Sequence, residues 1–175
     1  MQEDSLQPFL SLEELLFHVA TLKLPRHYTG KQKKAVVEEI ITSFGLEGCR
    51  DQRTESLSGG QRRRLYVAME LVDNPPVIFL DEPTTGLDNV SAGSILRLLQ
   101  HVAHQGRTVI CTIHQPSAKH FRYFDRVYVV GKGKCIYHGS TDHLVPFLSS
   151  AGLPCPINHN PADFSKLSIS KNHLL

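Results

Sequence analysis

Two adjacent carboxylates, Asp81 and Glu82, directly follow the short apolar run at residues 77–80. A continuous apolar run that comes after Pro75-Pro76 is typical of a strand buried on both faces. Open α/β sheets place their ligand sites at the carboxyl ends of strands. An aspartate there can hold Mg²⁺ beside phosphates, and the neighbouring glutamate can polarise an attacking water. The alternative is a strand that simply ends in an acidic turn.

A second candidate is Leu57-Ser58-Gly59-Gly60-Gln61, which comes immediately before an expected helix. Two glycines let a backbone approach a ligand closely, and the amides of a helix start attract anions such as phosphate. Ser58 could cap the helix and also offer its hydroxyl to a phosphate oxygen. By itself, such a turn is more often a loop and a helix cap. The arginines that follow, residues 62–64, are more often a solvated helix face than a phosphate clamp.

The third candidate is His114, at the end of a β-branched apolar run at residues 108–113. If this run and residues 77–80 are neighbouring strands, His114 lies at the same sheet edge as Asp81 and Glu82. It could then donate a hydrogen bond to a phosphate and help to position water. A lone histidine at a strand end is more often structural.

Helices are expected on both sides of the glycine-containing segment at residues 57–61. The capping box at residues 11–14 predicts a helix that ends before Pro25, and residues 31–44 predict a second helix, stopped by Gly45. The helix expected from Ser58 onward has one buried stripe: Leu65, Ala68, Met69 and Val72.

Strands and helices alternate after Pro76. The order strand, helix, strand predicts a crossover unit with a parallel sheet, and a Gly-Lys-Gly-Lys turn predicts an antiparallel hairpin near the end of the chain. The expected elements are a helix at 90–104, strands at 108–113, 126–130 and 135–138, and a short helix at 144–151.

Composition limits the class of protein. The 175 residues are 41% apolar and 21% charged with a net charge of +2, which is typical of a globular chain and argues against a strongly basic nucleic-acid binder. No apolar run approaches the roughly 18 residues that a membrane-spanning helix needs. The four cysteines form no CxxC pair and are read as reduced thiols. The ten histidines lack partners at metal-ligand spacing.

Taken together, these motifs resemble the nucleotide-binding domain of an ATP-binding cassette (ABC) protein, from Gln2 to about Phe164. The set that carries the resemblance is Leu57-Ser58-Gly59-Gly60-Gln61, residues 77–83, Gly86-Leu87-Asp88 and His114. Further segments resemble the G subfamily of white-type half-transporters, most closely its sterol- and lipid-exporting branch: residues 1–4, 8–10, 74–76, 110–117 and 160–164.

The resemblance implies the roles of the catalytic group. Gln2 is the Q-loop glutamine, which reaches Mg²⁺ and the attacking water and senses the transmembrane domain. Asp81 is the Walker B magnesium ligand, Glu82 is the catalytic base, and His114 is the switch histidine.

The resemblance also implies that the chain works beside a second ABC subunit, arranged head to tail. Ser58, Gly59, Gly60 and Gln61 form the signature, in which Ser58 and Gly60 contact the γ-phosphate of an ATP that the partner holds. Asp88 is the D-loop residue that crosses the dimer interface.

The fold that this resemblance implies is α/β: a partial P-loop NTPase-like ABC ATPase domain at residues 1–164, followed by a divergent tail at 165–175. It contains a helical signature subdomain, a parallel-sheet core and a C-terminal hairpin. The implied function is ATP hydrolysis with Mg²⁺ at the cytosolic face of a membrane, coupled to export of lipids, sterols or other hydrophobic substrates. The alternatives are a non-catalytic partner of a half-transporter and a soluble ABC ATPase, and no nucleic acid is expected as a ligand.

A Walker A loop, G-x-x-x-x-G-K-[ST], is the missing motif. Gly30-Lys31 has Pro25 at the first glycine position, and Gly133-Lys134 has Tyr128 there. We therefore expect the chain to begin inside the domain, to stop before the membrane helices, and to be inactive in isolation.

Overall fold

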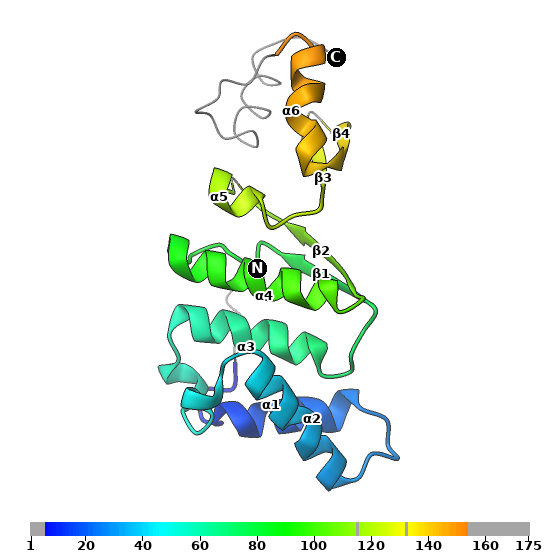
Figure 1. Cartoon of the computed structure of the whole chain (residues 1–175). Coiled ribbons are helices and arrows are strands. Elements are labelled where there is room, and N and C mark those ends of the chain that lie inside the picture. The colour runs from blue at the N-terminus through cyan, green and yellow to red at the C-terminus, as the bar shows by residue number, and fades with distance from the viewer. Residues whose placement is uncertain (1–5, 115, 132, 154–175) are drawn as a thin grey trace. The chain divides into compact units, whose positions relative to one another are not determined.

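The computed structural model describes residues 6–114, 116–131 and 133–153 (Figure 1). Its internal contacts divide the chain after Thr112 into two compact units. A division at this position was not predicted from the residues. The expected boundary between residues 164 and 165 lies outside the described residues and stays a prediction.

Three helices form the first part of the first unit: α1 (Leu12–Lys23), α2 (Gly30–Ser43) and α3 (Gly59–Leu71). Each begins at a capping box, in which the N-cap hydroxyl and the side chain three residues later each accept a backbone N–H. The box at Ser11 was predicted, whereas the box at Thr29 was not. Two 3₁₀ turns, Glu47–Cys49 and Thr54–Ser56, connect α2 to α3.

The core of the first unit lies where α1 packs against α2 and α3 (Figure 1). Aliphatic side chains at helical spacing meet there because each helix has one apolar face. The fully buried members include Leu12, Leu16, Ile41, Leu46, Leu65 and Ile95. Most of the stripe predicted for α3 is buried, with Met69 only partly covered.

A parallel strand pair follows α3: β1 (Val77–Asp81), α4 (Asn89–His104) and β2 (Thr108–Thr112). The two strands pair in parallel from Val77 opposite Thr108 to Asp81 opposite Thr112, which confirms the predicted parallel arrangement. Figure 1 shows α4 between α3 and these strands, and α4 contacts both α3 and β2.

The prediction that residues 77–80 are buried on both faces is wrong. Ile78 is 3% exposed, but Val77 is 42% exposed and Phe79 73% exposed. On β2, Ile110 is likewise 47% exposed. Successive side chains of a strand point to opposite faces, and α4 covers only one of the two faces within this unit.

The second unit contains a short helix, α5 (Ala118–Phe121), a hairpin of β3 (Arg126–Gly131) and β4 (Lys134–Ser140), and α6 (Thr141–Ser150). The two strands are antiparallel with a register shift after Val129, so the predicted hairpin is confirmed. Leu144 and Leu148 of α6 are buried. None of the described helices is both long and apolar enough to cross a membrane.

Three of the cysteines lie among the described residues, and all three are free thiols: Cys49, Cys111 and Cys135. Burial raises the pKa of the Cys111 thiol to about 11, and burial also raises the pKa of Cys49. Both thiols are therefore protonated at neutral pH, as expected of cysteines that contribute packing rather than chemistry.

Candidate functional site

The carboxylates predicted from the sequence lie at the end of β1, where Asp81 is the last strand residue and Glu82 follows it. Thr112, the last residue of β2, lies opposite Asp81 in the strand register. Its hydroxyl donates to Asp81 Oδ1 and accepts the backbone N–H of Glu82 at 3.0 Å. One hydroxyl therefore fixes both carboxylate residues. Thr112 was not among the predicted site residues, although its position at the end of the predicted neighbouring strand was a usable signal.

Glu82 has a left-handed backbone, with φ of 45°. This conformation is uncommon for a residue with a side chain and costs on the order of 1–3 kcal/mol, so neighbouring contacts must maintain it. Thr85 supplies two of them: its hydroxyl donates to Glu82 Oε2 at 2.8 Å, and its N–H donates to the Glu82 carbonyl at 3.2 Å. Strain of this kind concentrates at functional sites. It cannot be read from residue types.

The signature segment forms the N-terminal turn of α3, as predicted. The Ser58 hydroxyl accepts the N–H of Gln61 at 3.3 Å, and Gln61 Oε1 accepts the N–H of Ser58 at 2.9 Å. Leu57 is buried and anchors the turn, whereas Ser58 and Gly59 are exposed. The structure therefore holds the turn rigidly and leaves its outer side open.

Intrachain packing does not explain the two glycines of this turn. A Cβ at Gly59 would meet Leu87 at 3.6 Å, and a Cβ at Gly60 would meet the Ser91 side chain at 3.4 Å and beyond, which are van der Waals contacts a side chain can accommodate. Glycine in a helix costs roughly 0.5–1 kcal/mol relative to alanine. The reason for glycine is then sought on the outer, exposed side of the turn, where a ligand could approach the backbone closely.

Asp88 caps the start of α4. Its carboxylate accepts the N–H groups of Val90 at 2.9 Å and Ser91 at 3.0 Å. A side-chain hydrogen bond with Ser91, followed by these backbone N–H groups, lowers the pKa of Asp88 below its usual 3.8. The cap is a structural role for Asp88; its predicted role at a dimer interface stays a prediction.

Replacing Asp88 by asparagine is expected to make the free energy of unfolding fall less steeply as the pH is lowered. Because the folded-state pKa lies below the unfolded one, the carboxylate's stabilisation is complete above about pH 4 and is lost as the pH falls through the folded pKa. Urea unfolding of the wild type and Asp88→Asn between pH 2.5 and 6 measures this. Asparagine can still cap the helix, so a slope that is equally steep in both proteins would contradict the assignment.

The signature turn and the carboxylates lie at the same end of the first unit. Gly59 and Gly60 face Leu87 and Ser91 at the start of α4, just after the carboxylates in the chain. The starts of α3 and α4 and the end of β1 therefore lie at one end of the first unit, a proximity that was not predicted from the sequence.

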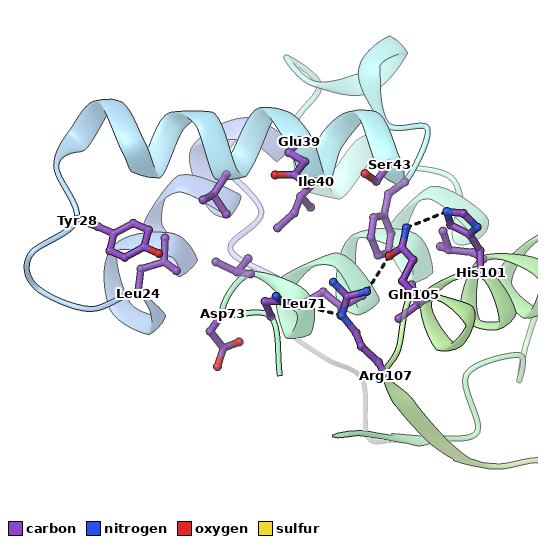
Figure 2. Close-up of a pocket in the computed structure, with 16 residues that line it drawn as sticks. Leu24, Tyr28, Glu39, Ile40, Ser43, Leu71, Asp73, His101, Gln105 and Arg107 are labelled. Carbon is purple, nitrogen blue, oxygen red and sulfur yellow. Dashed lines mark hydrogen bonds between the residues drawn. The ribbon is translucent and has the colours of Figure 1, made fainter. Parts of the chain in front are cut away.

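The opposite end of the same elements carries a groove of about 300 Å³ (Figure 2). Arg107 spans it: Nε donates to Asn74 Oδ1 at 2.8 Å, and Nη1 donates to Gln105 Oε1 at 2.7 Å. These bonds tie the start of β2 to the loop before β1, next to the Thr108 N–H bond to the Pro76 carbonyl. The groove therefore contributes to strand alignment and lies away from the carboxylates.

The three arginines at residues 62–64 are not a solvated helix face, so that interpretation is wrong. Each is only partly exposed and donates to a backbone carbonyl. Arg62 donates to Glu55, Arg63 to Thr85, and Arg64 to Gly45, at 3.2, 3.2 and 3.0 Å. They attach α3 to the loops around it.

Two predicted site residues lie outside the described part of the first unit. Gln2 lies outside the described residues. His114 belongs to the second unit, two residues after Thr112, so its predicted switch role stays a prediction. Among the described residues, no three His, Cys, Asp or Glu side chains gather in a way that could hold a metal ion by themselves.

Comparison with known proteins finds similar sequences along most of the chain. The family model described as ABC transporter matches residues 1–85. ABC transporter G family member 26 of Arabidopsis thaliana is 42% identical over 168 residues, which are 93% of this chain and 24% of that protein. Protein white of Drosophila melanogaster is 38% identical over 169 residues, 93% of this chain and 25% of that protein. The chain is therefore similar to ABC transporters along almost all of its length.

Its similarity is to the G family in particular. ABC transporter G family member 11 of Arabidopsis thaliana is 39% identical over 93% of the chain. The chain spans about a quarter of the length of the curated relatives it matches.

A solved structure confirms the predicted α/β fold of an ABC ATPase. It is a dimeric ATP-binding cassette in a post-hydrolysis state, bound to ADP and Pi, with 26% identity and a TM-score of 0.66. The match covers 81% of this chain and 61% of that one.

Proposed function

We propose that the chain is part of the ATP-binding and ATP-hydrolysing cassette of a G-type ABC exporter. The cassette acts at the cytosolic face of a membrane and couples ATP hydrolysis to transport of lipids, sterols or other hydrophobic substrates. One observation carries the proposal: an exposed glycine turn at a helix start and two fixed carboxylates at a strand end lie at the same end of one unit. The similarity to ABC transporters supports it.

Asp81 is the proposed Mg²⁺ ligand. Mg²⁺ is usually held by one or two carboxylates together with substrate phosphates and water, so a single oriented carboxylate at a strand end fits it. When bound, the ion neutralises charge on the phosphates. Thr112 orients the Asp81 carboxylate, and the left-handed backbone directs Glu82 as the base that takes a proton from water.

The signature turn is the proposed contact with a second ABC subunit. Ser58, Gly59, Gly60 and Gln61 present backbone amides and a hydroxyl on an exposed helix start, which suits the phosphates of an ATP that the partner holds. Asp88 keeps the start of α4 rigid beside this turn.

A chain without a Walker A sequence cannot build the phosphate cradle by itself. We therefore propose that the 175-residue chain alone hydrolyses no ATP and that it acts with an intact cassette. A non-catalytic partner that lowers the activity of a half-transporter is the second candidate, and the experiment below separates the two.

The test mixes the full chain with an intact G-family cassette and measures association by analytical ultracentrifugation, with and without Mg-ATP. We expect association only with Mg-ATP, lost in Gly60→Asp, which puts a carboxylate where phosphate must approach. Gly48→Asp is the matched control, because Gly48 has open space around it and lies outside the turn. Association without ATP would favour the non-catalytic partner, and no association would refute the pairing.

A further inference from the structure

A chain of contacts joins the signature helix to the carboxylate of Glu82. The Arg63 guanidinium, one turn into α3, donates from Nη2 to the Thr85 carbonyl at 3.2 Å. The Thr85 hydroxyl donates in turn to Glu82 Oε2 at 2.8 Å. All three residues belong to the first unit, so the path runs within one compact body.

We propose that Thr85 and Arg63 are positioning residues for Glu82, and this rests on the proposed function of Glu82 as the base. The left-handed backbone of Glu82 fixes only the direction of its Cα–Cβ bond, because the side chain still has three rotatable bonds. The Thr85 hydroxyl fixes one carboxylate oxygen, which directs the other toward water. Arg63 fixes the backbone of Thr85, so the orientation of Glu82 depends on the position of α3.

The neighbouring arginines make the assignment specific. Arg62 donates to the Glu55 carbonyl, and Arg64 donates to the Phe44 and Gly45 carbonyls, all in the helical part that precedes α3. Arg63 instead reaches the loop between β1 and α4. Arg62 and Arg64 attach α3 to the preceding helical part, whereas Arg63 attaches it to the loop between β1 and α4. A displacement of α3 can therefore be transmitted to that loop through Arg63.

The consequence is a link between two sites within one chain. The signature turn at the start of α3 faces an ATP held by the partner, whereas Glu82 faces the chain's own nucleotide position. The Arg63–Thr85–Glu82 path therefore lets contact at the first position alter the geometry at the second. No interaction across a subunit boundary is needed for this step.

The experiment uses the full chain with ¹³C-labelled glutamate and no nucleotide, so it is independent of whether the chain binds ATP. Three-bond couplings and the separation of the two Glu82 Hγ signals report whether its side chain holds one rotamer. The variants are Thr85→Val, which keeps the shape and removes the hydroxyl, Thr85→Ser, which restores it, and Arg63→Met. Arg62→Met is the matched control on the same helix.

We expect one Glu82 rotamer in the wild type, Thr85→Ser and Arg62→Met, and averaged couplings with merged Hγ signals in Thr85→Val and Arg63→Met. A fixed rotamer in Thr85→Val would overturn the role of Thr85. Averaging in Thr85→Val but not in Arg63→Met would overturn the role of Arg63. If the Glu82 couplings were averaged equally in Arg62→Met, the cause would be a general loosening of α3, and the proposed Arg63–Thr85–Glu82 path would be overturned. Backbone amide spectra identify a variant that fails to fold, in which case Thr85→Ala replaces Thr85→Val.

Discussion

ATP turnover is expected to fall by about 10²- to 10⁴-fold when Glu82 is replaced by glutamine, the range that a general base contributes. Glutamine has nearly the same shape and can still accept the Thr85 hydroxyl bond, but it cannot take a proton from water. The loss should therefore appear in kcat with little change in KM, because ground-state binding of ATP does not use the proton-accepting step.

The measurement requires a complete nucleotide site. Residues 6–153 of this chain replace the corresponding stretch of an intact G-family cassette, which then supplies the Walker A loop. Glu55→Gln is the control, since Glu55 is an exposed glutamate near the signature turn whose side chain touches neither carboxylate. Turnover within a few-fold of the parent in Glu82→Gln would assign the proton transfer to another residue.

Leu65→Ala is expected to lower the free energy of unfolding by about 2–5 kcal/mol, the usual cost of truncating a fully buried leucine. Leu65 is 0% exposed on α3 and belongs to the core that joins the three helices. Domains are commonly stable by only about 5–15 kcal/mol, so this one change removes a large share. It also releases the helix that carries both the signature turn and Arg63.

Urea denaturation followed by circular dichroism gives the free energy, and a second probe in the first unit checks that the transition is cooperative. Leu22→Ala is the matched control: it removes the same atoms from α1 at a position that is 85% exposed, so a change within about 0.5 kcal/mol is expected. If the two variants were equally stable, Leu65 would not belong to the core of the folded chain in solution.

The secondary structure of the first unit could be predicted because its signals are local. The capping box at Ser11, the cap expected of Ser58, the stop at Gly45 and the apolar period of α3 act over a few residues, and the helices formed where expected. The parallel pairing of β1 and β2 followed from the order of elements. The same order also located the two carboxylates at a strand end.

The remaining features depend on contacts between segments distant in the sequence. The exposure of Phe79 depends on which face α4 covers, and an apolar run looks the same whether one face is covered or two. The hydrogen bond from Thr85 to Glu82 needs the folded loop, because any threonine in a loop could make or miss it. Thr112, by contrast, could have been found from its position at the end of β2. The arginines after the signature looked solvated because their carbonyl partners lie in other segments.

The left-handed backbone at Glu82 matters for any screen of variants at this position. Glycine adopts this conformation without the roughly 1–3 kcal/mol that a side chain costs, so Glu82→Gly removes the backbone strain together with the proposed base. A library ranked by expression level or by melting temperature alone would therefore not detect the loss of that base. Turnover has to be measured beside yield for variants of Glu82.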